Sequence, residues 1–446
     1  MNTLNLQKKP LSSSVSDPLK GAVTPPGDKS ISHRSIMLGG IAQGRTTVRG
    51  LLEGEDVFST MAALRAMGAS IERQDDAWII DGVGLLDNLA EPSCVLDMGN
   101  SGTSARLLMG LVAGRPMTTF FTGDASLCKR PMRRVIDPLS QMGARFVSRK
   151  EGRMPLAVEG AASIRPISYR LPVASAQVKS AILLAGLSCD GITEVIEPVP
   201  TRDPTERMLR AFGAQLDISK TDDGADLIRL QGRPVLTGRT IEVPADISSA
   251  AFPMVAACLC EGSDVVLNNV GINERRAGIL HSLLEMGAKI EIMNKRELGG
   301  EPVADLRVCA SPLSGVTIPE ARVPSMVDEY PVLAMAAALA KGTSRFCGLK
   351  ELRVKESDRL TLVAKGLAQA GVAVEVEGDD LIIHGTGTPP QGGVMIDTAL
   401  DHRIAMSFLV LGFVTREPMT IDDGRVIATS FPDFIPLMNR LGASLS

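Results

Sequence analysis

Aromatic side chains are scarce in this sequence. The 446 residues include one tryptophan, two tyrosines and 11 phenylalanines, which is 3% in all. Proteins that bind single-stranded nucleic acids need aromatic platforms for the bases, and a general nucleic-acid surface needs an excess of positive charge. The formal net charge here is −4. Nucleic-acid binding is therefore disfavoured, and any basic site must be local.

Histidine and paired cysteine are also scarce. The chain has four histidines, and its seven cysteines, an odd number, include no Cys-x-x-Cys pair. A zinc site uses clustered cysteine and histidine ligands, and a disulfide framework needs an even set of cysteines. The stretch GNSGTSARLLMG contains glycine but lacks the spacing of a phosphate-binding P-loop. We therefore expect no metal, no cofactor, and reduced thiols.

Long apolar runs are missing. No run reaches the roughly 18 residues that a membrane-spanning helix needs. The start of the chain, MNTLNLQKKPLSSSVSDPLKG, lacks the apolar centre of a signal peptide. We expect a cytoplasmic protein with no membrane partner, in which about the first dozen residues form a loose tail.

Repetition is the main feature that the sequence does contain. With 446 residues and 44% hydrophobic side chains, the chain is long enough for two domains. Six segments of helical pattern end in a glycine that is followed by an alternating, strand-like stretch. Glycine is the usual residue for the left-handed backbone that stops a helix. The six glycines are Gly68, Gly143, Gly213, Gly287, Gly371 and Gly442.

Each of these segments is preceded by a polar cluster that opens a run of small apolar residues. The runs are too apolar for surface helices, so they predict helices buried in a core. The six openings are DKSISHRSIMLGG, GNSGTSARLLMG, ASAQVKSAILLAG, ADISSAAFPMVAAC, VDEYPVLAMAAAL and DHRIAMSFLVLG.

The chain is thus predicted to hold six units of about 70 to 80 residues, each with a buried helix, a more amphipathic helix and several strands. Two similar stretches, VTPPGDKS and EVPADISS, mark Pro26 and Pro244 as crossover points. We expect residues 27–244 to form one domain, and residues 1–26 and 245–446 to form the other, which the N-terminal strand completes. A solenoid built for stability alone is the alternative, but solenoid repeats are usually shorter and these openings differ chemically.

The stretch DKSISHR places Lys29 and Arg34 at the mouth of a buried helix. A helix N-terminus already presents free N–H groups and a partial positive charge, so further cations are unfavourable there unless an anion binds. Any one of these cations could simply face solvent. Because other openings and the segments KRP, TRD and KESDR also carry cations, the repeated pattern predicts a local anion site.

Nine motifs follow one another along the chain: DKSISHR, GNSGT, GDASLCKRPM, ASAQVKSAILLAG, PTRDPTE, SMVDEYP, LRVKESDR, LDHRIAMS and ATSFPDF. In this order they resemble the EPSP synthase family of enolpyruvyl transferases, from about Gly21 to Leu441. The resemblance implies an α/β fold of two inside-out domains, each of three βαβαββ units, with the active site in the cleft between the domains. It also implies closure on substrate.

The resemblance implies the reaction as well. The family transfers the enolpyruvyl (carboxyvinyl) group of phosphoenolpyruvate to the 5-hydroxyl of shikimate 3-phosphate and releases phosphate, in the shikimate pathway of aromatic amino acid biosynthesis. Two phosphates and two carboxylates enter the site, which accounts for local cations in an acidic protein. No cofactor is involved, and we expect a monomer.

The family's substrate-binding positions carry over onto this chain motif by motif. Those for shikimate 3-phosphate correspond to Lys29, Ser30, Arg34, Ser175, Ala176, Gln177, Arg202, Asp328 and Lys355, with Ala176 contributing only its backbone. Those for phosphoenolpyruvate correspond to Lys29, Asn100, Gly102, Thr103, Arg130, Gln177, Glu356, Arg359, His402 and Arg403.

Two carboxylates and a lysine are the candidate catalytic residues. By resemblance, Asp328 accepts the 5-hydroxyl proton and Glu356 protonates the methylene carbon of phosphoenolpyruvate, with Lys29 as the rival acid. Nearby cations lower a carboxylate pKa, so Glu356 can act as an acid only if burial or a like charge offsets them. The alternative for Asp328 is the N-cap of the helix that VDEYP opens, and the two roles are compatible.

The chain departs from the common family pattern at Thr429, where many relatives carry a lysine that contacts phosphoenolpyruvate. Together with Leu107, this resembles a divergent branch in which insensitivity to the herbicide glyphosate is common. Insensitive relatives often carry alanine at the position of Gly102, however, so the retained glycine predicts inhibition. The alternative is that Gly102 supplies an unusual backbone angle at a helix start.

The nearest rival is the sister transferase that acts on UDP-N-acetylglucosamine. It typically has a reactive cysteine five residues before the arginine of its loop, which is Ala125 here. Cys128 lies nearby but is expected to be an ordinary small residue. A non-catalytic or RNA-binding scaffold built on the same repeat is a further alternative, although it would not need Asp328, Glu356 and the arginines together.

Overall fold

The computed structural model describes residues 8–84 and 88–446. The chain divides into two compact units. Unit 1 contains residues 1–26, 245–297 and 301–446, and unit 2 contains residues 27–244 and 298–300. The main bounds fall at Pro26 and Pro244, and Leu298–Gly300 joins unit 2 in addition. Among the described residues, no helix has the length and hydropathy needed to cross a membrane.

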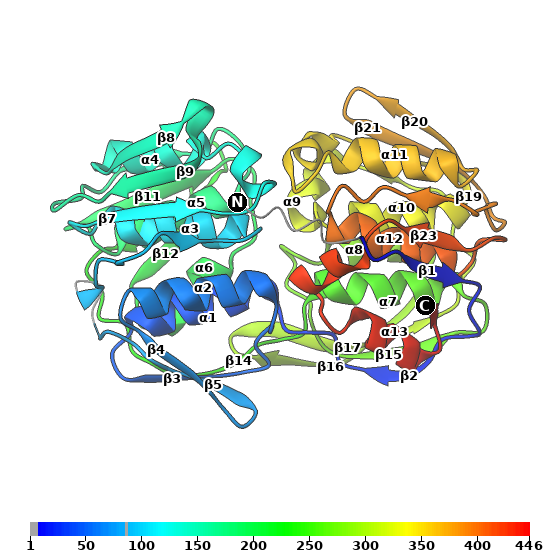
Figure 1. Cartoon of the computed structure of the whole chain (residues 1–446), viewed down its shortest axis with the longest axis horizontal. Helices are drawn as coiled ribbons and strands as arrows, with labels where there is room; N and C mark the ends of the chain where they lie inside the picture. Colours follow the sequence, from blue (N-terminus) through cyan, green and yellow to red (C-terminus); the bar gives the residue numbers. More distant parts are fainter. Residues whose placement is uncertain (1–7, 85–87) are drawn as a thin grey trace. The chain divides into compact units, whose positions relative to one another are not determined.

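Unit 2 contains three four-stranded sheets (Figure 1). In sheet order the strands are β14 (Thr240–Glu242), β3 (Arg45–Arg49), β5 (Ala77–Asp81) and β4 (Ser70–Gln74); β6 (Leu96–Asp97), β7 (Thr118–Thr122), β9 (Arg153–Glu159) and β8 (Arg145–Arg149); and β10 (Ser168–Arg170), β11 (Ile192–Glu197), β13 (Asp226–Gln231) and β12 (Leu216–Lys220). Its helices are α1 (Lys29–Ile41), α2 (Glu55–Ala66), α3 (Gly102–Ala113), α4 (Arg133–Met142), α5 (Ala176–Gly186) and α6 (Pro204–Ala211).

Unit 1 also contains three four-stranded sheets. In sheet order the strands are β16 (Lys289–Leu298), β17 (Glu301–Cys309), β15 (Asp264–Gly271) and β2 (Lys20–Val23); β18 (Thr317–Ile318), β19 (Lys341–Phe346), β21 (Asp380–Thr386) and β20 (Ala373–Glu377); and β22 (Met395–Ile396), β23 (Met419–Ile421), β1 (Leu11–Ser14) and β24 (Ser444–Leu445). Its helices are α7 (Ile247–Leu259), α8 (Gly278–Glu285), α9 (Val323–Met326), α10 (Tyr330–Leu339), α11 (Arg359–Gln369), α12 (His402–Gly412) and α13 (Phe434–Leu441).

All six sheets share one pairing pattern, which confirms the predicted α/β repeat. In each sheet one edge pair of strands is parallel, as β6 is with β7. The other pairs with a defined register are antiparallel, as β9 is with both β7 and β8. The chain order within a repeat, for example β6, α3, β7, α4, β8 and β9, is the expected βαβαββ order. A parallel pair needs a crossover connection, and in repeats such as β6, α3 and β7 the buried helix supplies it.

Two of the repeats are completed across the crossover points. Strand β2 precedes α1 in the chain but pairs with β15, and β14 precedes α7 but pairs with β3. The similar stretches found in the sequence follow these two strands and lead into α1 and α7. The backbone N–H of Asp28 donates to the Pro244 carbonyl at 2.8 Å, and that of Asp246 donates to the Pro26 carbonyl at 2.8 Å.

The N-terminal segment corrects one prediction. The loose tail was expected over about the first dozen residues, but Lys8 pairs with Asp422 at 2.5 Å and β1 begins at Leu11. Strand β1 pairs antiparallel with β23 and β24, so Leu11 lies opposite Ile421. The strand is held because it supplies a missing member of the last repeat's sheet. Residues 1–7 lie outside the described residues.

The predicted helix ends are confirmed. The six repeat glycines have backbone φ values from +87° to +119°, the left-handed region in which glycine avoids the strain of a side chain. They follow the amphipathic helices α2, α4, α6, α8, α11 and α13.

The predicted buried helices form the cores of the two units. In α10 every residue from Tyr330 to Ala338 is buried, and α1, α3, α5, α7 and α12 are buried over most of their length. Helices α3 and α5 pack closely in unit 2 (Figure 1). A Cβ atom on Gly110 would lie 2.3 Å from the Ala181 carbonyl oxygen, so only glycine allows the two backbones to approach this closely. The polar openings of these helices are therefore the parts left for function.

Candidate functional site

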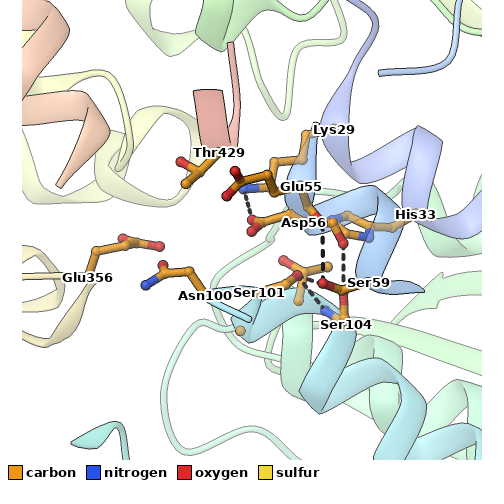
Figure 2. Close-up of polar contacts among 12 residues, drawn as sticks. Lys29, His33, Glu55, Asp56, Ser59, Asn100, Ser101, Ser104, Glu356 and Thr429 are labelled. Atoms are coloured by element: carbon orange, nitrogen blue, oxygen red, sulfur yellow. Dashed lines mark hydrogen bonds and ion pairs between the residues drawn. The ribbon is translucent and has the colours of Figure 1, made fainter. Parts of the chain in front are cut away.

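The N-terminus of α1 carries a cation that is held by a buried carboxylate. Asp28 is the N-cap, and its Oδ1 accepts from the backbone N–H of Ile31 at 2.9 Å. Lys29 forms an ion pair with Asp56 of α2, and Figure 2 shows the two side chains pointing toward each other. Asp56 is 5% exposed. Asp56 could not be identified from the sequence, because it belongs to no motif and lies in the first turn of an ordinary helical pattern.

Arg34 is 4% exposed, and three hydrogen bonds hold its guanidinium. Its Nε donates to the Thr205 hydroxyl at 2.6 Å, its Nη2 donates to the Ser180 hydroxyl at 2.8 Å, and its Nη1 donates to the Ser30 carbonyl at 2.8 Å. These partners lie on α6, α5 and α1. The guanidinium is therefore oriented by the protein itself, as a binding cation requires.

His33, from the same motif, has a different environment. Its ring is buried, and its Nδ1 lies 2.8 Å from the hydroxyl of Thr60. Burial, and then the positive charges of Lys29 and Arg34, hold the pKa of His33 well below its ordinary value. The imidazole is therefore neutral at physiological pH, and it adds no charge to the anion site.

The N-termini of α3 and α5 are joined by Gln177. Its Nε2 donates to the Thr103 hydroxyl at 3.0 Å, and its Oε1 accepts from Arg106 at 2.9 Å. Ser175 is the N-cap of α5, where its Oγ accepts from a backbone N–H, and Ala176 is the first helical residue. These residues come together at the polar end of a buried helix pair, where backbone N–H groups favour an anion.

Asn100 and Arg130 lie together beside the start of α3. Arg130 is 7% exposed, and its Nη2 donates to the Asn100 side-chain oxygen at 3.1 Å. The Asn100 amide donates to Asp124 at 2.6 Å. The cap of α3 is Ser101, whose Oγ accepts from the Ser104 N–H at 3.1 Å (Figure 2). The structure thus brings together the GNSGT motif, which contains Asn100, and the GDASLCKRPM motif, which contains Arg130.

Gly102 is the first residue of α3 and does not have a positive φ. The alternative that it supplies an unusual backbone angle is therefore wrong. A Cβ atom there would lie 2.7 Å from Arg106 Nη1 and 2.9 Å from Arg130 Nη1. The glycine leaves room for two guanidinium groups, so an added methyl group would act on those arginines rather than on the backbone.

Arg202 lies in the segment between β11 and α6 and is partly exposed. With it, all the residues predicted for unit 2 have been placed. They gather at the openings of α1, α3 and α5 and in the segments before α4 and α6, and they are Lys29, Ser30, Arg34, Asn100, Gly102, Thr103, Arg130, Ser175, Ala176, Gln177 and Arg202.

In unit 1 the predicted residues gather around Arg359, which is 1% exposed. Its guanidinium donates to Asp328 at 3.1 Å, to Glu356 at 2.6 Å and to Asp401 at 2.8 Å. Burial alone would lower the pKa of Arg359, but the nearby carboxylates outweigh it, so the net shift is upward. Arg359 is therefore always charged, and it holds the two predicted catalytic carboxylates beside each other.

Asp328 does not cap α10. The N-cap position belongs to Glu329, whose side chain makes no capping hydrogen bond. Asp328 Oδ1 instead faces both Arg359 and Lys355, whose Nζ lies 3.3 Å away. The helix-cap interpretation of Asp328 is wrong, since two cations from other segments orient its carboxylate.

Asp401 is a neighbour of the candidate site that the predicted substrate-binding and catalytic sets do not include. It is fully buried, caps α12 by accepting from the Arg403 N–H at 2.9 Å, and binds Arg359. Burial raises the pKa of Asp401, but Arg359 outweighs this and the net shift is downward. The DHR motif already marked Asp401 as a polar residue at the opening of a buried helix. The motif's other two residues, His402 and Arg403, begin α12, and Arg403 donates to the Asp328 carbonyl at 3.2 Å.

Comparison with known proteins identifies the family. The model of the EPSP synthase (3-phosphoshikimate 1-carboxyvinyltransferase) family matches residues 14–438. The chain belongs to this family.

Relatives of the EPSP synthase family match almost the whole chain. A 3-phosphoshikimate 1-carboxyvinyltransferase of Rhodospirillum rubrum is 60% identical over 443 residues, which is 98% of each chain. One of Paramagnetospirillum magneticum is 60% identical over 442 residues, which is 99% of each. The solved EPSP synthase of Acinetobacter baumannii has a TM-score of 0.85 and 47% identity, and the match covers 98% of this chain and 99% of that one.

A more distant enolpyruvyl transferase, NikO from Streptomyces tendae, has a TM-score of 0.78 at 18% identity. At this identity the likeness shows the fold alone. In agreement with membership of the EPSP synthase family, Cys128 is an ordinary partly buried residue whose thiol donates to the Gly123 carbonyl at 3.3 Å. The interpretation as the sister transferase is not supported.

Proposed function

We propose that this chain transfers the carboxyvinyl group of phosphoenolpyruvate to the 5-hydroxyl of shikimate 3-phosphate, which is the activity of its family. The observation that carries the site assignment is the pair of carboxylates, Asp328 and Glu356, bound by the buried guanidinium of Arg359. Asp328 and Glu356 keep 17% and 18% of their side chains exposed, as groups that must reach a substrate require, whereas Asp401 on the same guanidinium is fully buried.

Shikimate 3-phosphate is proposed to bind through cations and helix N-termini of both units. The pre-oriented guanidinium of Arg34 and the α5 N-terminus suit a phosphate, because both present fixed N–H donors. Lys355 and Asp328 would bind the hydroxyl side of the ring. The full proposed set is Lys29, Ser30, Arg34, Ser175, Ala176, Gln177, Arg202, Asp328 and Lys355.

Phosphoenolpyruvate is proposed to bind mainly to arginines. A planar guanidinium can meet a carboxylate or a phosphate with two parallel hydrogen bonds. Since Thr429 stands where many relatives have a lysine, the remaining cations carry more of the charge. The full proposed set is Lys29, Asn100, Gly102, Thr103, Arg130, Gln177, Glu356, Arg359, His402 and Arg403.

The proposed chemistry is addition followed by elimination. Asp328 accepts the 5-hydroxyl proton while the oxygen attacks C2 of phosphoenolpyruvate, and Glu356 gives a proton to C3, forming a tetrahedral ketal phosphate. Loss of phosphate from C2 and of a proton from C3 then restores the double bond in the product. Because the Arg359 guanidinium donates to Glu356 at 2.6 Å and the donor to C3 must carry a proton, Lys29 is the alternative proton donor.

We further propose that the two units are domains that act on the same substrates, because the proposed residues for each substrate come from both. Substitutions in either unit should then weaken binding of shikimate 3-phosphate. One chain carries every proposed site residue, which supports a monomer as the functional form. The monomeric state and the cytoplasmic location stay predictions.

A phosphate-release assay tests the function. With phosphoenolpyruvate present, we expect the purified protein to release phosphate when shikimate 3-phosphate is added and not when UDP-N-acetylglucosamine is added. Turnover with the nucleotide sugar alone would support the sister transferase. Release with neither acceptor would support a non-catalytic scaffold and would refute the proposed function.

Gly102 gives a prediction about inhibition. We expect the unmodified protein to be inhibited by glyphosate in competition with phosphoenolpyruvate, and Gly102→Ala to relieve most of that inhibition. The added methyl group would press on Arg106 and Arg130, and one methyl group in a filled pocket costs about 1 to 3 kcal/mol. Glyphosate is the longer ligand, so phosphoenolpyruvate should lose less affinity. Inhibition constants and KM values for both proteins measure this.

The KM for shikimate 3-phosphate and the thermal unfolding midpoint serve as controls for Gly102→Ala, because both should stay near the values of the unmodified protein. Equal damage to both ligands would contradict the steric explanation. So would strong glyphosate resistance in the unmodified protein.

A further inference from the structure

A second cluster of buried charges lies in unit 2, outside the residues assigned to the substrates. Lys179 Nζ lies 2.8 Å from a carboxylate oxygen of Glu197 and 2.7 Å from one of Glu206. The exposed fractions of the three side chains are 0%, 0% and 1%. The proposed chemistry uses none of them.

The cluster carries one positive charge and two acidic groups in the protein core. Burial lowers the pKa of Lys179, but Glu206 and Glu197 outweigh it, so the net shift is upward and the lysine is charged. For Glu206 burial is the largest influence, and the net shift of its pKa is upward. Well-packed apolar residues usually stabilise a core as well as, or better than, such a cluster. Stability alone is therefore a poor reason for these charges.

Each member lies close in the chain to a residue that is proposed to bind shikimate 3-phosphate or that holds one. Lys179 is one turn into α5, whose first turn contains Ala176 and Gln177. Next to Lys179, the hydroxyl of Ser180 accepts from Arg34 at 2.8 Å. The lysine thus anchors the helix that presents these groups.

The two glutamates hold the next segments. Glu197 ends β11, and its Oε1 accepts from the Thr201 hydroxyl at 2.5 Å, one residue before Arg202. Glu206 is in the first turn of α6, next to Thr205, whose hydroxyl accepts from Arg34 at 2.6 Å. The hydrogen bond from Thr201 to Glu197 therefore holds the segment that carries Arg202 next to the buried end of β11.

We propose that Lys179, Glu197 and Glu206 are positioning residues for shikimate 3-phosphate: their ion pairs lock α5, the segment before α6, and α6 in the arrangement that presents Ser175, Arg202 and Arg34. This inference rests on the proposed function. The charges are retained because three segments must meet at defined distances, which directional ion pairs enforce and apolar contacts do not.

The first test is Thr201→Val, with Thr193→Val as the matched control. Both threonines are buried, and Thr193 lies on β11 like Glu197. Thr201→Val removes the hydrogen bond to the Glu197 carboxyl group and keeps the side-chain shape, so we expect about a tenfold rise in KM for shikimate 3-phosphate. The kcat and the KM for phosphoenolpyruvate should stay within about twofold, and Thr193→Val should leave all three constants within that range.

The second test is the triple variant Lys179→Met, Glu197→Gln, Glu206→Gln. It removes all three ionisable groups together, so no buried charge is left without its partner. We expect cooperative thermal unfolding near the midpoint of the unmodified protein and a rise of at least about tenfold in KM for shikimate 3-phosphate, with a smaller change in kcat. Single substitutions are avoided because one lost partner can prevent folding.

An unchanged KM for shikimate 3-phosphate in Thr201→Val would overturn the proposal, and so would an unchanged KM in a folded triple variant. If the triple variant fails to fold, Thr201→Val and its control decide. A failure of the proposed function is distinguishable, since the unmodified protein itself would then show no turnover with shikimate 3-phosphate.

Discussion

Asp328→Asn is expected to lower turnover by roughly 10²- to 10⁴-fold while substrate binding stays near normal, because asparagine cannot accept the 5-hydroxyl proton. The asparagine oxygen can still accept hydrogen bonds from Arg359 and Lys355, which lie 3.1 and 3.3 Å from Asp328 Oδ1. The geometry of the site should therefore survive. Steady-state kcat and calorimetric dissociation constants for shikimate 3-phosphate measure the two effects separately.

Asp264→Asn is the matched control for this variant. Asp264 also lies in unit 1 and binds an arginine, Arg307, at 2.7 Å, but both side chains are largely exposed. Its substitution should leave kcat unchanged, because exposed ion pairs contribute little. Normal turnover in Asp328→Asn would remove the aspartate from the base role.

The second large effect is expected for the arginines proposed to bind phosphoenolpyruvate. Arg130→Ala, and separately Arg403→Ala, should weaken its binding by about 2 to 5 kcal/mol, the range for removing one side of a desolvated charge pair. Both guanidinium groups are oriented by protein acceptors: Arg130 donates to the Asn100 side-chain oxygen and Arg403 donates to the Asp328 carbonyl. Titration calorimetry with phosphoenolpyruvate, in the presence of shikimate 3-phosphate, measures the loss.

Arg134→Ala is the control for Arg130→Ala, because Arg134 is an exposed arginine of α4, four residues along the chain. It should change the affinity by less than about 0.5 kcal/mol. An unchanged affinity in Arg130→Ala or in Arg403→Ala would exclude that arginine from the phosphoenolpyruvate site. Thermal unfolding of each variant separates lost binding from lost structure.

The ends of the helices and the number of repeats could be predicted from the sequence because local features decide them. Glycine at a helix end is favoured by its own backbone freedom, so Gly68 and Gly442 mark helix ends without any knowledge of the fold. Apolar runs such as the one after Asp401 indicate buried helices because a helix that is apolar on all faces must lie in a core. The resemblance of the motifs then indicated the family and the residues of the candidate site.

The errors and omissions concern partners far away in the chain. Within the described residues the prediction of a loose tail was wrong, because β1 pairs with β23 and Leu11 lies opposite Ile421. A short polar strand has little preference of its own, so only the sheet that it completes decides its structure. Asp56 was missed because its role depends on Lys29, and nothing in its local pattern distinguishes it from a surface residue of α2.

By itself, the sequence determined the six repeats, the helix ends, the family motifs and the acidic balance that confines the cations to a local site. Only the tertiary structure decided what individual polar residues do. From the sequence, Asp328 could cap a helix or bind cations, and Gly102 could be needed for its backbone angle or for the space it leaves to neighbouring arginines. Nothing in the sequence around Lys179 indicated its ion pairs with two buried glutamates. The physical reason is that backbone propensities act within a few residues, whereas charges and close contacts act between segments that only the fold brings together.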